Sequence, residues 1–154
     1  MIILVFSDSH GSLGEMISLV EEHSPDMILH LGDCSPDGED LASIYPQIPL
    51  YQVPGNCDPF DPSPPIQSLE VQGVKLLFSH GHLWSVKQRK DVAVAVARKE
   101  KAQIVLYGHT HIADAHQEPD GLWVLNPGAS TQTYGTITLE NGEICCQTFS
   151  SRKK

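Results

Sequence analysis

Histidine, aspartate and asparagine side chains that could bind metal ions follow short apolar runs at five places in this chain. The runs cover residues 2–6, 27–31, 50–53, 74–78 and 104–107. Short continuous apolar runs are typical of buried strands in parallel sheets, and ligands bind at the carboxyl ends of such strands. We therefore predict a metal site at this edge. Its candidate ligands are Asp8, His10, Asp33, Asn56, His80, His109 and His111.

The spacing and chemistry of these residues favour two ions. Asp8 and His10 are two residues apart, as are His109 and His111. On an extended backbone both side chains of such a pair point the same way, so we expect each pair to reach one ion. Asp33 could bridge two ions through its two carboxylate oxygens. A mixture of imidazole and carboxylate suits Mn, Fe, Zn, Ni or Co better than Ca or Mg.

The elements that must position these residues alternate between strand and helix in the first half of the chain. Ser12 and Glu15 have the spacing of a capping box, which predicts a helix that ends at Ser24-Pro25. Further helices are predicted over residues 39–45 and 92–101.

Strands dominate the second half. Residues 67–71 and 74–78 predict a hairpin. Further strands are predicted over residues 111–115, 122–125, 133–139 and 144–149, with Asn141-Gly142 as a type I′ turn. A βαβ first half followed by a β-rich second half predicts an α/β protein in which two sheets pack together, flanked by helices.

Length and composition predict one domain over residues 1–150, followed by a basic tail at 151–154. The 40% hydrophobic and 19% charged residues are ordinary for a soluble enzyme. No apolar stretch approaches the roughly 18 residues needed to span a bilayer. The first residues have the pattern of a strand, without the basic region of a signal peptide, so we expect a cytoplasmic protein.

A formal net charge of −9 argues against stable binding to nucleic acid or to an anionic membrane, because such binding depends on Lys and Arg. The four cysteines lack CxxC spacing. Cys145 and Cys146 would point to opposite faces of a strand, so we expect reduced thiols.

The five motifs in chain order are Asp8-Ser9-His10, Gly32-Asp33, Gly55-Asn56, Ser79-His80 with Gly81, and Gly108-His109-Thr110-His111. In this order they resemble those of the calcineurin-like metallophosphoesterases, and most closely the small single-domain bacterial and archaeal phosphodiesterases of that superfamily. The resemblance covers residue 8 to about residue 130. It implies a four-layer α/β/β/α sandwich with two mixed sheets.

The resemblance also implies the roles of individual residues. Asp8, His10 and His111 would hold one metal; Asn56, His80 and His109 would hold the other, and Asp33 would bridge both. Manganese is the first choice, with Zn, Ni, Fe and Co as alternatives. The implied reaction is in-line attack on a phosphodiester by a hydroxide that bridges the two ions, with the Asn56 amide stabilising charge on the phosphoryl oxygens.

Two positions depart from the family pattern. Cys57 follows Asn56 where many members have His, and a thiol assists a leaving group less well than imidazole. Weak monoester hydrolysis is therefore expected. Residues 126–130 have an Ala before the Ser of the usual Asn-Pro-Gly-Ser, with no Arg nearby, so this loop lacks features that a phosphate contact in the family pattern uses.

A small phosphorylated substrate is the expected partner. The alternative is a catalytically weak protein-binding scaffold of the same fold, which would have no need of all seven ligands. A nuclease acting on polymers is disfavoured by the acidic composition. Strand edges in the second half would permit a homo-oligomer, and the oligomeric state stays open.

Overall fold

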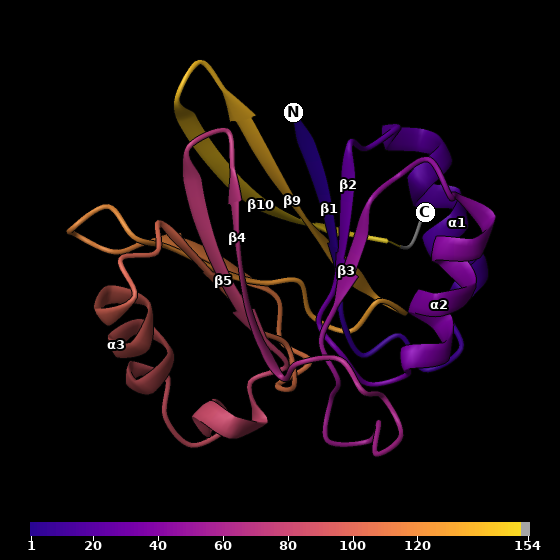
Figure 1. The fold of residues 1–154 in the computed structure, drawn as a ribbon, viewed down its shortest axis with the longest axis horizontal. Helices are drawn as coiled ribbons and strands as arrows, with labels where there is room; N and C mark the ends of the chain where they lie inside the picture. Colours follow the sequence, from indigo (N-terminus) through magenta and orange to yellow (C-terminus); the bar gives the residue numbers. More distant parts are fainter. Residues whose placement is uncertain (152–154) are drawn as a thin grey trace.

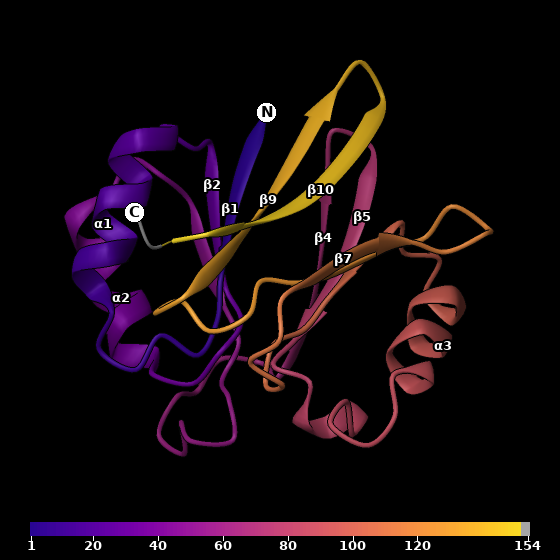
Figure 2. The same ribbon diagram turned by 180° about the vertical axis from the view of Figure 1, so that it is seen from behind.

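Two five-stranded sheets pack face to face in the computed structural model, which describes residues 1–151 (Figure 1). Helices α1 and α2 cover the outer face of one sheet, and α3 covers the outer face of the other (Figures 1 and 2). This arrangement is the predicted four-layer sandwich of two mixed sheets flanked by helices. None of the helices in the described residues is long and apolar enough to cross a membrane.

The first sheet has the strand order β10 (Glu143–Ser150), β9 (Thr133–Glu140), β1 (Ile2–Phe6), β2 (Met27–His30), β3 (Leu50–Gln52). The second has the order β4 (Ile66–Val71), β5 (Val74–Ser79), β6 (Ile104–Leu106), β8 (Trp123–Asn126), β7 (Asp114–Gln117). The helices are α1 (Leu13–His23), α2 (Ser35–Ile44), α3 (Asp91–Lys99) and the 3-10 turn η1 (His82–Trp84).

Parallel pairing brings the predicted site strands together. β1 pairs with β2 and β2 with β3 in parallel, as do β5 with β6 and β6 with β8. The remaining pairs are antiparallel, including the predicted β4–β5 hairpin. Asn141 and Gly142 both have positive φ, as the predicted type I′ turn between β9 and β10 requires.

The apolar runs are continuous because both faces of their strands are buried. In β1, Ile3 and Val5 pack between the two sheets, whereas Leu4 and Phe6 pack against α1 and α2. A separate cluster, in which Val105 of β6 takes part, lies between the second sheet and α3. Burial of alternate residues on opposite faces fixes the register of each strand, and with it the position of the polar residues that follow.

Three predictions need correction. α2 begins at Ser35 instead of residue 39, because Pro36 suits a first helical turn, where its missing N–H costs nothing. The strand predicted over residues 111–115 is β7, which begins at Asp114, since His111 has a positive φ that extended backbone excludes. The capping box does not form: Ser12 precedes α1 without a side-chain hydrogen bond to it.

The helix predicted over residues 92–101 is present as α3, and α1 ends at a left-handed Ser24 as expected. All four cysteines are free, with Cys145 exposed and Cys146 buried on the opposite face of β10. Residues 152–154 of the predicted basic tail lie outside the described residues.

Candidate metal centre

The candidate ligands lie on loops at the carboxyl ends of strands from both sheets. Figure 1 shows that these ends point to the same side of the sandwich, where the loops that follow β1, β3, β5 and β6 gather. The site is therefore built across the junction of the two sheets, and neither sheet alone could form it.

Six of the seven predicted ligands form two groups. Asp8, His10 and His111 make one group, and Asp33, His80 and His109 make the other. Within each group the candidate ligand atoms lie within 4.8 Å of one another. His109 and His111 thus belong to different groups, contrary to the expectation that this pair reaches one ion. Asn56, the seventh, is an exposed residue of the loop that follows β3.

The two groups are contiguous through His80. Its Nε2 atom lies 3.4 Å from an Asp33 oxygen, 3.8 Å from an Asp8 oxygen and 3.1 Å from His109 Nδ1. Its Nδ1–H donates to the Leu31 carbonyl at 2.7 Å, which orients the ring so that Nε2 faces the cluster. Metal-bound histidines are commonly oriented by such a bond to a backbone carbonyl. The donor set fits divalent ions.

The electrostatics of the second group depend on burial and on neighbouring charges. Burial alone would raise the pKa of Asp33, but hydrogen bonds from His80 and the Cys57 N–H lower it. Burial lowers the pKa of His80, but Asp33 and Asp8 raise it overall. Burial lowers the pKa of His109, helped by His80 and Lys87. The Asp33 carboxylate therefore stays ionised, ready to bind a cation.

Backbone strain is concentrated at the ligands. Positive φ angles occur at Asp8 (52°), His10 (41°), Asp33 (58°), His109 (69°) and His111 (63°). Such conformations cost of order 1 kcal/mol or more each in non-glycine residues and collect at functional sites. The sequence argument assumed extended backbone at Asp8–His10 and 109–111; that assumption was wrong, because these residues lie in tight loops beyond the strands.

Asp58 connects the two loops that carry Asp33 and Asn56. Its Oδ2 accepts the backbone N–H groups of Asp33 and Gly55, both at 2.8 Å. Its Oδ1 accepts those of Cys34 at 3.0 Å and Ser35 at 2.9 Å. One buried carboxylate therefore holds four backbone donors. Its proline-rich neighbourhood, residues 58–65, indicated only a surface loop.

His30 and Asp37 connect the first two ligand loops in a similar way. The Gly32 N–H donates to His30 Nδ1, so the neutral ring carries its proton on Nε2 and donates it to Ser9 Oγ at 3.0 Å. The Ser9 hydroxyl donates to Asp37, which also accepts the Gly11 N–H. His30 is a buried histidine with both ring nitrogens hydrogen-bonded, and it also fixes the loop that carries Asp8 and His10.

The loop at residues 126–130 supports the last ligand loop. The Asn126 amide donates to Thr110 Oγ1 at 2.8 Å, and its oxygen accepts the Gly128 N–H. The Ser130 hydroxyl donates to the Ser7 carbonyl at 2.9 Å. These contacts give the loop a structural role. The loop can fulfil this role without binding phosphate, although its sequence departs from the family pattern.

Glycine precedes three of the ligands, Asp33, Asn56 and His109, for steric reasons that are clearest at the last two. A β-carbon at Gly55 would lie 2.0 Å from Asp33 Oδ1, and one at Gly108 would lie 2.0 Å from Ser7 Oγ. Both distances are far below van der Waals contact. Close approach of the loops, which the cluster needs, therefore excludes any side chain at these positions.

Three further histidines and Trp84 differ in their position relative to the cluster. The His82 ring lies 5.5 Å from the His80 ring and 6.2 Å from the His109 ring, next to the second group. Trp84 is buried and packs in the core, so it cannot stack on a substrate. His23 bonds the Tyr134 hydroxyl, and His116 is exposed beside Asp114 and Glu118.

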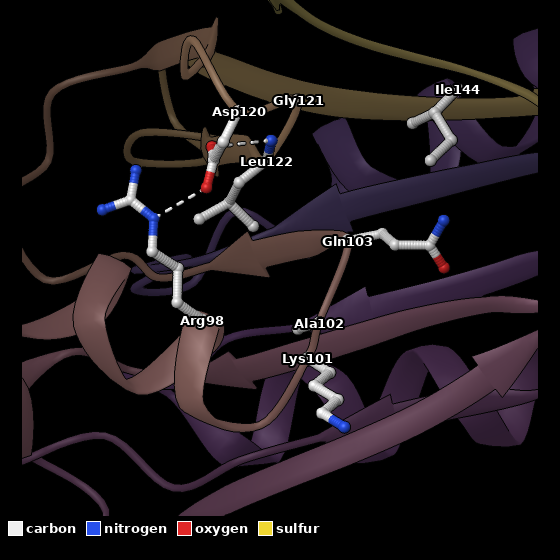
Figure 3. Close-up of a pocket in the computed structure, with 8 residues that line it drawn as sticks. All are labelled: Arg98, Lys101, Ala102, Gln103, Asp120, Gly121, Leu122 and Ile144. Atoms are coloured by element: carbon white, nitrogen blue, oxygen red, sulfur yellow. Dashed lines mark hydrogen bonds and ion pairs between the residues drawn. The ribbon is translucent and has the colours of Figure 1, made fainter.

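A cavity of about 580 Å³, shown in Figure 3, is remote from this chemistry. It is lined by residues that precede β6 and β8 and by Ile144 near the start of β10, at the end of the sandwich opposite to the ligands. Its Arg98 is engaged with Asp120 at 2.8 Å. A cavity of about 370 Å³ instead adjoins the cluster at Cys57, beside Asn56.

Comparison with known proteins gives consistent matches over nearly the full chain. Residues 1–145 match the family model of the calcineurin-like phosphoesterase superfamily domain. The probable metallophosphoesterase YsnB of Bacillus subtilis is 31% identical over 151 residues, which cover 92% of this chain and 86% of YsnB. A similar protein of Mycoplasma pneumoniae, also named a probable metallophosphoesterase, is 28% identical over 158 residues, covering 96% of this chain and 95% of its own.

Solved structures agree with the fold. A predicted phosphoesterase of Streptococcus pneumoniae has a TM-score of 0.79 at 25% identity and covers 97% of this chain and 89% of its own. Vps29 of Entamoeba histolytica, solved with Zn²⁺, has a TM-score of 0.76 at 16% identity and covers 99% of this chain and 100% of its own. The second match bears on the fold alone.

Proposed function

Because this chain belongs to the calcineurin-like phosphoesterase superfamily, we propose that it is a metal-dependent phosphoesterase that prefers phosphodiesters and binds two divalent ions. The observation that carries the proposal is the pair of contiguous ligand groups across the two sheets. Asp8, His10 and His111 would hold one ion and His80, His109 and Asn56 the other. Asp33, 3.4 Å from His80 Nε2, would bridge them.

The chemistry that such ions supply when bound is a hydroxide nucleophile at neutral pH and neutralisation of charge on the phosphoryl oxygens during in-line displacement. The protein's own residues orient the reactants. Leu31 fixes the His80 ring and Asp58 fixes the loops that carry Asp33 and Asn56. The exposed Asn56 amide would donate to a phosphoryl oxygen, so no serine or cysteine nucleophile is needed.

The preference for diesters is argued from Cys57. Its thiol is exposed next to Asn56, where an imidazole would otherwise face the leaving oxygen. A thiol is a weak hydrogen-bond donor, so a leaving group receives little help. Monoesters carry more negative charge and depend more on that help, and we expect them to react slowly.

The metal is proposed to be manganese, with Zn, Ni, Fe and Co as alternatives, because histidine and carboxylate ligands suit this group of ions. We further propose a cytoplasmic location, a small phosphorylated substrate and self-association into a homo-oligomer. We expect no stable binding to nucleic acid or to a membrane. These proposals rest on the acidic composition and the strand edges of the second half.

The test is metal-dependent hydrolysis. The protein is stripped with chelator and reloaded with Mn²⁺, and its turnover of bis-p-nitrophenyl phosphate is compared with that of p-nitrophenyl phosphate. Asp33→Asn should abolish turnover, whereas Asp40→Asn, an exposed carboxylate of α2, should not. Metal-independent turnover, or equal activity of the two variants, would refute the proposal.

The alternative function is a scaffold, motivated by the relative named vacuolar protein sorting-associated protein 29 of Schizosaccharomyces pombe, which is 28% identical over 100 residues. A scaffold gains nothing from seven filled ligand positions. Two bound ions per chain without turnover of any phosphate ester would favour it over the enzyme.

A further inference from the structure

The cavity that adjoins the metal centre lies between the first turns of α2 and the loop after β3. It measures about 370 Å³ and is lined by Ser35, Pro36, Glu39, Cys57, Asp58, Pro59, Phe60 and Asp61. Two of these residues lie close in sequence to candidate ligands: Cys57 directly follows Asn56, and Ser35 lies two residues after Asp33. A phosphate bound at the centre would therefore have one of its ester arms within reach of this cavity.

The walls of the cavity are partly apolar. Pro36 and Pro59 line it, and Phe60 is 96% exposed, the largest exposure among the large hydrophobic side chains described. An aromatic ring that is left in water at the edge of a cavity offers its face to a ligand. The π face carries partial negative charge and attracts cations.

The charged groups of the cavity are all acidic. Asp58, Asp61 and Glu39 line it, and its lining includes no Lys or Arg. Asp58 accepts four backbone N–H groups, and Asp61 accepts the Ser35 hydroxyl and the Ser63 N–H. Glu39 is exposed, and no hydrogen bond or ion pair to it is recorded among residues 1–151.

Resting on the proposed function, we propose that this cavity holds one ester arm of the substrate and selects an arm that carries an organic cation, such as a quaternary ammonium group on a short alcohol. Glu39 would supply a negative charge that is exposed to the ligand, and Phe60 would supply the aromatic face. An anionic arm would be repelled by the three carboxylates, and a neutral arm would gain only the apolar contact.

The activity test uses two diesters that differ in charge but not in shape. One is p-nitrophenyl phosphorylcholine, and the other is p-nitrophenyl 3,3-dimethylbutyl phosphate, whose arm is the neutral isostere of choline. At low ionic strength we expect kcat/KM for the cationic diester to be about tenfold higher, from one exposed ion pair and one cation–π contact.

Variants distinguish the effect of the cavity residues on substrate preference from the effect of the protein's overall negative charge. Glu39→Gln should lower the ratio of the two kcat/KM values about threefold, and Phe60→Leu about twofold. Glu143→Gln, at the start of β10, makes the same charge change on an exposed residue outside the cavity lining and should leave the ratio as it is. An unchanged ratio in Glu39→Gln, or an equal loss in Glu143→Gln, would overturn the inference.

A binding measurement keeps this inference distinguishable from the proposed function. Tetramethylammonium chloride, with tert-butyl alcohol as the neutral control, is titrated into ¹⁵N-labelled protein in the presence of zinc. We expect amide shifts at residues 39, 57, 58, 60 and 61 that Glu39→Gln weakens. These shifts without turnover of either diester would overturn the proposed function and support the cation site. Turnover of both diesters without shifts or preference would overturn the cation site alone.

Discussion

Replacing Asp58 by Asn should loosen the metal centre although no candidate ligand is removed. The carboxylate accepts four backbone N–H groups from the two loops that carry Asp33 and Asn56. An Asn oxygen can accept two of them, but the Asn amino group would face the other two donors. Two hydrogen bonds are lost, and the remaining two lose the help of a full negative charge.

The cost follows from these contacts. A hydrogen bond to a charged group contributes about 1.5–3 kcal/mol, and water can replace part of it at the half-buried Cys34. We therefore expect a loss of about 2–4 kcal/mol in the free energy of unfolding, which for a chain of this length lowers Tm by about 5–15 °C. Displacing groups that orient the ligands typically weakens metal binding about 10–100-fold.

The assay is thermal unfolding of the metal-free protein together with calorimetric titration of Mn²⁺. Asp26→Asn is the matched control, because Asp26 accepts a single N–H, from Ile2, at an exposed site. It should cost less than about 1 kcal/mol and leave metal affinity unchanged. If Asp58→Asn binds Mn²⁺ as tightly as the wild type, or if both variants lose equal stability, the reasoning fails.

Three further changes test other parts of the structure. Burial holds the pKa of His30 below its ordinary value. The free energy of unfolding of the wild type should therefore fall as the pH is lowered below about 6.5, by up to about 1.4 kcal/mol per pH unit. In the metal-free protein His30→Gln should flatten this slope, and an unchanged slope would contradict the reasoning. Cys57→His should raise monoester over diester turnover about tenfold, since imidazole assists the leaving group better than a thiol; equal ratios would refute this. Gly108→Ala should destabilise the protein by about 1–3 kcal/mol, and Ser7→Ala in the same chain should restore part of that loss; no restoration would argue against the contact.

The strands were predictable from the sequence because burial on both faces requires a continuous run of apolar residues. β1 is packed on both faces, between second-sheet residues such as Phe78 and Leu106 and the helix residue Met16, so its residues 3–6 are all buried and apolar. The first polar residue then marks the carboxyl end of the strand and the edge where ligands gather. Both the fold class and the candidate ligands followed from this one property.

The geometry of the ligand loops was not predictable, because distant contacts determine it. The Asp8 N–H donates to the Gly32 carbonyl, and the His109 N–H donates to an Asp8 oxygen. Such bonds join residues far apart in sequence and maintain the positive φ angles of the loops. No local pattern encodes them. For the same reason Asp58 was assigned to an exposed proline-rich loop although it is buried, and only Pro36 gave a local signal that α2 starts early.

The balance of charge at the cluster favours cation binding over a scaffold role. Asp8 and Asp33 are almost completely buried, and among residues 1–151 only histidines are recorded as ion-pair partners for them. Burial of a carboxylate carries a desolvation cost, which hydrogen bonds offset at Asp33, and the strained backbone at both residues adds a further cost. A protein that used this surface only for docking would gain nothing from bearing these costs. Divalent ions would offset both costs at once, and we therefore expect Mn²⁺ to raise the Tm of the wild type and not that of Asp33→Asn.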